Sequence, residues 1–73
     1  MLLHEKIRAI RIQKGYSRRK LADLTDSTAT HIYYIEEHKR PNPRLISIVK
    51  IAKALGLTMD ELLAGTEFDG SQQ

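Results

Sequence analysis

The chain has 73 residues, no cysteine and a formal net charge of +3. This length allows a single domain with a small core, and the lack of cysteine excludes disulfides and thiolate metal sites. No apolar run approaches the length of a membrane span, and the N-terminus lacks the apolar segment of a signal peptide. We therefore expect one soluble, cytoplasmic domain without a membrane segment, a metal or other cofactor, or a small-molecule substrate.

The charge is distributed unevenly along the sequence. Residues 1–53 contain all 12 lysines and arginines and 5 of the 9 acidic residues, whereas residues 54–73 contain 4 acidic residues and no basic one. A basic concentration in one part of a small domain is typical of proteins that bind polyanions. A polyanion is therefore expected to bind the N-terminal, basic part of the chain.

The first predicted helix covers residues 4–14. Ile7 and Ile10 share one face of it, while charged residues occupy the other faces. Gly15 suits the left-handed position that follows a helix, so the helix is expected to end there. Ser17 is then well placed to cap a second helix.

Residues 17–36 are predicted to form two short helices joined by a tight turn. Thr25, Asp26 and Ser27 are residue types that leave helices readily, and Thr28 is a good N-cap for the helix that follows. The apolar faces of the two helices are expected to contain Leu21, Ala22, Leu24, Ile32 and Ile35. A helix, a turn and a helix in about twenty residues is the helix-turn-helix arrangement.

Three cations, Arg18, Arg19 and Lys20, occupy the first turn of the second predicted helix. The helix dipole favours anions at this position, by roughly 0.3 to 1 kcal/mol for each charge. One interpretation is a solvated basic face that is tolerated at low cost. The favoured interpretation is that Arg18 and Arg19, with the free N–H groups of the helix end, bind a phosphate.

The third predicted helix carries small and aromatic residues on its polar face and has no lysine or arginine. The methyl groups of Ala29 and Thr30 are suited to contact a thymine methyl, and the Thr30 hydroxyl is suited to a base edge. Tyr33 lies one turn further along and is placed to reach a base edge or a phosphate. For Tyr33 and for Tyr34, packing within the protein and contact with a ligand remain alternatives.

The connection after this helix is polar, and Lys39 and Arg40 are placed to contact backbone phosphate. A fourth helix is expected from Pro43 to Leu55, with Asn42 as its N-cap. Its broad apolar stripe is expected to contain Leu45, Ile48, Val49, Ile51, Ala52 and Leu55. The helix is expected to stop at Gly56.

The segment 58–61 has the residues of a capping box, which opens a short fifth helix. Leu62 and Leu63 of that helix are expected to close the core. Residues 64–73 show no periodicity and are expected to form a flexible C-terminal tail, so the folded domain is predicted to cover residues 1–63.

The order and spacing of these features resemble the Cro/CI-type helix-turn-helix domain of phage repressors and of xenobiotic-response-element regulators. The resemblance covers roughly residues 5 to 63, and its single motifs are weak while their combination is specific. The matching motifs are Ile7-x-x-Ile10-Arg11, Lys14-Gly15-Tyr16-Ser17, Leu21-Ala22, Ile32-x-x-Ile35-Glu36, Lys39-Arg40-Pro41, Ile51-Ala52-x-x-Leu55-Gly56-Leu57 and Leu62-Leu63.

The resemblance implies an all-α, compact five-helix bundle of the lambda-repressor-like type, with the third helix in the DNA major groove. It also implies a buried structural ion pair between Arg11 and Glu36. The family's base-reading positions correspond to Ala29, Thr30 and Tyr33. Its phosphate-contacting positions correspond to Arg18, Thr28, Lys39, Arg40 and Asn42.

The chain departs from the family pattern at three places. Arg18 stands where the family often has a glutamine that contacts phosphate and supports the recognition helix. Asp26 and Ser27 stand where it usually has glycine and valine, and His38 stands where it usually has glycine.

Two classes of function are compatible with these observations. The first is a sequence-specific DNA-binding transcriptional regulator, a repressor that binds a two-fold symmetric operator on double-stranded DNA as a homodimer. The alternative is a protein-interaction module on the same fold, such as an antitoxin or an adaptor. The cations at the start of the second helix and after the third favour DNA binding. Catalysis is poorly supported, because His4, His31 and His38 lack carboxylates at ligand spacing.

Overall fold

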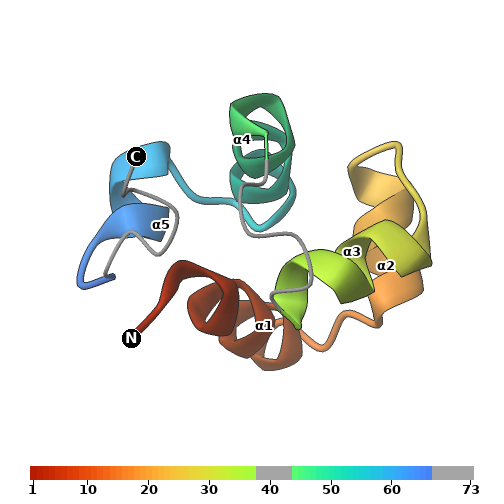
Figure 1. Cartoon of the computed structure of the whole chain (residues 1–73), viewed down its shortest axis with the longest axis horizontal. Helices are drawn as coiled ribbons and strands as arrows, with labels where there is room; N and C mark the ends of the chain where they lie inside the picture. The colour runs from red at the N-terminus through yellow and green to blue at the C-terminus, as the bar shows by residue number, and fades with distance from the viewer. Residues whose placement is uncertain (38–43, 67–73) are drawn as a thin grey trace.

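The computed structural model describes residues 1–37 and 44–66, and these residues form five α-helices (Figure 1). The helices are α1 (Leu3–Gln13), α2 (Arg18–Leu24), α3 (Ala29–Glu36), α4 (Leu45–Ala54) and α5 (Met59–Leu63). The predicted all-α, five-helix fold is therefore confirmed.

Helices α2 and α3 pack against each other, and both lie against the rest of the bundle. α1 contacts α3 and α5, while α4 contacts α2 and α5, so each helix has at least two neighbours (Figure 1). One apolar cluster lies at the centre of this arrangement, as periodicity predicts for amphipathic helices. Its buried members are Leu3, Ile7, Leu21, Ala22, Ile32, Ile35, Ile48, Ile51, Ala52, Leu55 and Leu62.

Side-chain caps begin three of the five helices, at the residues that the sequence predicts. The Ser17 hydroxyl accepts the backbone N–H of Lys20 at 3.0 Å, and the Thr28 hydroxyl accepts that of His31 at 3.1 Å. At α5, the hydroxyl of Thr58 and the carboxylate of Glu61 form a reciprocal capping box. Each cap satisfies N–H groups that have no partner within the helix.

The start of α4 differs from the prediction. The helix begins at Leu45 with Arg44 as its N-cap residue, and no side chain caps it. The predicted cap Asn42 and first residue Pro43 lie outside the described residues. Cap geometry at Arg44, which has an extended backbone with φ −67° and ψ 144°, places the boundary two residues later than expected.

Two predicted core residues lie at the surface. Leu45 is 71% exposed, because it occupies the first turn of α4, one turn before the buried Ile48. Leu24 is 46% exposed, because it is the last residue of α2 and faces an open cleft between α2 and α4. Both residues have the helical spacing of the core, but each lies at the end of its helix, where no other described residue packs over it.

Helix α5 is held to α1 by a polar contact as well as by its apolar face. Leu62 is fully buried, and Leu63 is partly buried against the core. The Lys6 ammonium of α1 donates to the carbonyl oxygens of Glu61, at 2.8 Å, and Ala64, at 2.6 Å. A cation at these carbonyls satisfies acceptors that a helix C-terminus leaves without partners, and it interacts favourably with the helix dipole.

Side-chain hydrogen bonds shape the turn between α2 and α3. The hydroxyl of Thr25 is buried and donates to the carbonyl of Leu21 at 2.9 Å, and it lies 2.9 Å from the Ser27 hydroxyl. Between them, Asp26 has φ +57°, the left-handed conformation. Aspartate adopts this conformation more readily than most non-glycine residues, which explains how the turn forms without a glycine.

We expect Asp26→Ala to lower the free energy of unfolding by about 1 to 2 kcal/mol, because alanine has the full steric cost of a left-handed backbone. Asp26→Gly should be at least 1 kcal/mol more stable than Asp26→Ala, since glycine lacks Cβ. Urea denaturation followed by circular dichroism measures both. Equal stabilities of the two variants would contradict this account of the turn.

Candidate nucleic-acid interface

The outer side of α3 presents a surface of small and aromatic side chains. Ala29, Thr30 and Tyr33 are all exposed, while Ile32 and Ile35 on the opposite face of the helix are buried in the core. The three residues that were predicted to read bases therefore share the outer side of this helix. Because Ala29 and Thr30 are small, they leave the backbone at the start of α3 accessible to a groove of matching shape.

The two tyrosines of α3 contact each other at this surface. Tyr33 and Tyr34 are each 39% exposed, and their ring centroids lie 5.9 Å apart with an interplanar angle of 52°. This tilted arrangement is favourable for aromatic rings. Each tyrosine therefore packs against a neighbouring ring and still keeps more than a third of its surface accessible for contact with a ligand.

The basic first turn of α2 contains one partly buried and two exposed cations. Arg19 and Lys20 are exposed, and the part of the chain that the structure describes offers their side chains no ion-pair partner. Arg18 is different, because its side chain is only 33% exposed and is directed toward α3. The predicted phosphate-contacting Thr28 is exposed at the N-cap of α3, while Lys39, Arg40 and Asn42 lie outside the described residues.

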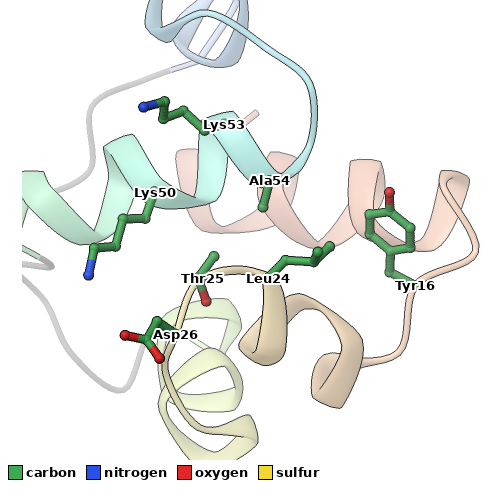
Figure 2. Close-up of a pocket in the computed structure, with 7 residues that line it drawn as sticks. All are labelled: Tyr16, Leu24, Thr25, Asp26, Lys50, Lys53 and Ala54. Atoms are coloured by element: carbon green, nitrogen blue, oxygen red, sulfur yellow. The ribbon is translucent and has the colours of Figure 1, made fainter.

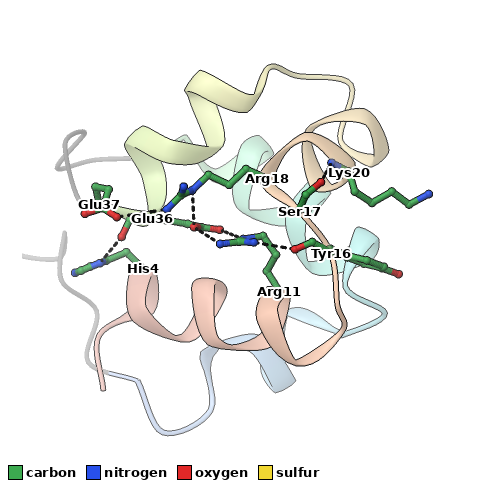
Figure 3. A network of polar contacts seen from close by, with 8 residues as sticks. All are labelled: His4, Arg11, Tyr16, Ser17, Arg18, Lys20, Glu36 and Glu37. Atoms are coloured by element: carbon green, nitrogen blue, oxygen red, sulfur yellow. Dashed lines mark hydrogen bonds and ion pairs between the residues drawn. The ribbon is translucent and has the colours of Figure 1, made fainter.

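A buried ion pair connects α1 with the end of α3 (Figure 3). Arg11 donates through Nε to Glu36 Oε2 at 2.6 Å and through Nη2 to Glu36 Oε1 at 3.1 Å. Its Nη1 donates to the carbonyl of Tyr16 at 2.8 Å. The Glu36 side chain is fully buried, so this is the ion pair that the family resemblance implied, in bidentate geometry.

Arg18 extends this pair into a network that the sequence did not reveal (Figure 3). Its Nε donates to Glu36 Oε1 at 3.2 Å, and its Nη2 lies 3.5 Å from Glu37 Oε2. Its guanidinium carbon lies 5.1 Å from the centroid of the Tyr33 ring. This contact cannot be predicted from the separation of Arg18 and Glu36 in the sequence, because it depends on how the turn orients α2 relative to α3.

A cleft lies between α2 and α4 (Figure 2). Its volume is about 550 Å³, and it opens beside the exposed Leu24 at the end of α2. The residues that line it are Tyr16, Leu24, Thr25, Asp26, Lys50, Lys53 and Ala54.

Titratable side chains are not grouped for metal binding in residues 1–37 and 44–66, where no three His, Asp or Glu residues lie together. Helices in the same residues also lack the combined length and apolar character needed to cross a bilayer. The imidazole of His4 contacts the backbone of α3, because its Nδ1 lies 3.1 Å from the carbonyl oxygen of Glu36.

We expect Glu36→Gln to lower the free energy of unfolding by about 3 to 5 kcal/mol, because it leaves the buried Arg11 guanidinium without a countercharge. Glu37→Gln is the matched control, since the Glu37 side chain is 40% exposed. Its effect should be within about 0.5 kcal/mol. Urea denaturation of both variants is the measurement, and equal midpoints for the two would contradict the structural role of Glu36.

Comparisons with known proteins agree with the fold. Residues 7–62 match the family described as "Helix-turn-helix". The chain is 32% identical over 74 residues to the HTH-type transcriptional regulator DdrOP3 of Deinococcus deserti, covering 99% of this chain and 55% of that protein. It therefore spans about half the length of this curated relative.

A solved structure gives the same result. The crystal structure of the restriction-modification controller protein C.AhdI from Aeromonas hydrophila is similar, with a TM-score of 0.77 and 32% sequence identity. The match covers 82% of this chain and 89% of the controller protein. The helices, the buried ion pair and these matches together show that the chain belongs to the Cro/CI-type helix-turn-helix family.

Proposed function

We propose that the protein is a sequence-specific DNA-binding transcriptional regulator, and specifically a repressor that binds a two-fold symmetric operator as a homodimer. The observation that carries this proposal is the outer face of α3, where Ala29, Thr30 and Tyr33 are exposed and the Arg18 guanidinium of α2 lies 5.1 Å from the Tyr33 ring centroid. The family relatives, a transcriptional regulator and a restriction-modification controller protein, support the same class of function.

In this proposal α3 enters the major groove and its exposed residues contact base edges. Thr30 offers a hydroxyl and a methyl group, Ala29 offers a methyl group, and Tyr33 offers a phenol. The first turn of α2, with Arg18 and Arg19, contacts the phosphate backbone together with Thr28. The family correspondence adds Lys39, Arg40 and Asn42 to the phosphate contacts. Residues 1–63 are the DNA-binding domain and residues 64–73 are the tail.

A homodimer fits this function because two copies of one helix-turn-helix can read two symmetric half-sites. The surface around α5 is the proposed contact between copies. Met59 and Leu63 are only partly buried there and lie next to each other in the same short helix. The protein-interaction alternative, an antitoxin or an adaptor, would use the α3 surface or the tail to bind a protein and would not need the exposed cations of α2.

Selection of binding sites from a random duplex DNA pool tests the proposal directly. We expect the purified chain to enrich a two-fold symmetric site whose half-sites are centred about 10 bp apart. Its affinity should fall steeply between 50 and 200 mM salt, by about 10³-fold or more if six or more phosphates are contacted. An unenriched pool with weak, salt-sensitive binding would contradict sequence recognition by this chain and favour the protein-interaction alternative.

Two substitutions separate phosphate contact from base contact. Arg19→Ala should weaken binding to all sequences about equally and lower the slope of log affinity against log salt by roughly one. Thr30→Ala should change the preferred base at one position of each half-site, by about 1 to 3 kcal/mol of discrimination. Fluorescence anisotropy on matched duplexes measures both. An unchanged base preference in Thr30→Ala would remove Thr30 from the base-contacting residues.

A further inference from the structure

Arg18 is assigned to phosphate contact by family correspondence, but its contacts in the free protein point to a second role. Two carboxylates share its charge, since Nε lies 3.2 Å from Glu36 Oε1 and Nη2 lies 3.5 Å from Glu37 Oε2. A cation neutralised in this way attracts a phosphate less strongly than the exposed Arg19 does. The nitrogen atoms of Arg18 point along α3, toward its C-terminal end (Figure 3).

The same guanidinium lies beside the ring of Tyr33. Its central carbon is 5.1 Å from the ring centroid, within the range of a cation–π interaction. The carboxylates occupy N–H groups at the edge of the planar guanidinium, so a face remains for the ring. Glu36 is itself fixed from the other side by Arg11, which gives Arg18 a rigid, buried attachment point.

Tyr33 therefore has two neighbours at this surface, one from α2 and one from its own helix. The Arg18 guanidinium is one, and the Tyr34 ring, with its centroid at 5.9 Å, is the other. An exposed tyrosine without such contacts would sample several side-chain rotamers and would lose that freedom on binding. The two contacts restrict the ring before DNA arrives.

We propose that Arg18 is a positioning residue that determines specificity through Tyr33, by holding the phenol in the orientation that reads one base pair. This inference rests on the proposed function, because it concerns the same DNA-binding face. It assigns to Arg18 an effect on which base is preferred, which a phosphate contact alone would not have.

Arg18→Lys separates the two roles, because lysine keeps the positive charge but lacks the planar group that can pair with carboxylates and stack on a ring. We expect its salt slope to equal that of the unmodified chain. Discrimination should fall about two- to fivefold, the size of an exposed cation–π contact, at the one base pair that also loses preference in Tyr33→Leu. Arg8→Lys, an exposed arginine on α1, is the matched control and should leave the profile unchanged.

A double substitution tests whether Arg18 acts through Tyr33. If it does, Arg18→Lys in the Tyr33→Leu background should cause no further loss of discrimination at that base pair. Additive losses would mean that Arg18 affects discrimination independently of Tyr33, and they would overturn the proposal. An unchanged base preference in Arg18→Lys would also overturn it and leave Arg18 as a phosphate contact. Circular dichroism and urea midpoints confirm that each compared variant is folded.

A measurement without DNA distinguishes failure of this inference from failure of the proposed function. In proton NMR of the free protein, the Arg18 side-chain protons should be shifted upfield by the Tyr33 ring, and the shift should vanish in Tyr33→Leu. The Tyr33 Hα–Hβ couplings should indicate one rotamer in the unmodified chain and averaging in Arg18→Lys. Averaged couplings in the unmodified chain would overturn the positioning role even if DNA binding is specific. An unenriched DNA pool with a fixed Tyr33 ring would instead overturn the DNA-reading role, and with it the assignment of specificity to Arg18.

Discussion

The buried carboxylate of Glu36 is the interaction on which the helix-turn-helix depends. It is the last residue of α3, and it accepts hydrogen bonds from Arg11 of α1 and Arg18 of α2. A charge with no solvent access is costly unless it is paired and hydrogen-bonded, so three helices must come together at this point. The apolar core brings the helices into contact, and this network fixes the end of α3 relative to α1 and α2.

This network also changes how the basic residues should be counted. Residues 18–20 look equivalent in the sequence, as three adjacent cations in the first turn of a helix. The fold uses Arg18 to connect α2 with Glu36 and Glu37, while Arg19 and Lys20 remain exposed. The basic surface offered to a polyanion is therefore smaller than the three adjacent cations indicate, and a structural arginine borders the face proposed to read bases.

The turn between α2 and α3 illustrates a second way in which the chain keeps the family geometry. Where the family usually has glycine and valine, Asp26 adopts a left-handed backbone and the neighbouring hydroxyls of Thr25 and Ser27 contact each other. The Thr25 hydroxyl also donates to a carbonyl of α2, so polar contacts help to close the helix end. Local hydrogen bonds thus stabilise a turn that lacks glycine, the residue with the lowest steric cost in a left-handed conformation.

The sequence by itself determined the number of helices, the caps at Ser17, Thr28 and Thr58, and most of the core, because caps and periodicity depend on residues within one or two turns of each other. It also placed Ala29, Thr30 and Tyr33 on one outer face, since that face is opposite the apolar spacing of α3. These properties are local and do not require knowledge of how the helices pack.

Only the tertiary structure decided which residues with core spacing are buried and which charged side chains contact partners on other helices. Leu24 and Leu45 have core spacing yet are exposed, because burial at a helix end depends on whether another element lies there. The contact of Lys6 with carbonyls near Glu61 and that of Arg18 with Glu36 join residues 55 and 18 positions apart. Such pairs depend on the relative placement of whole helices, for which a single sequence carries no local signal.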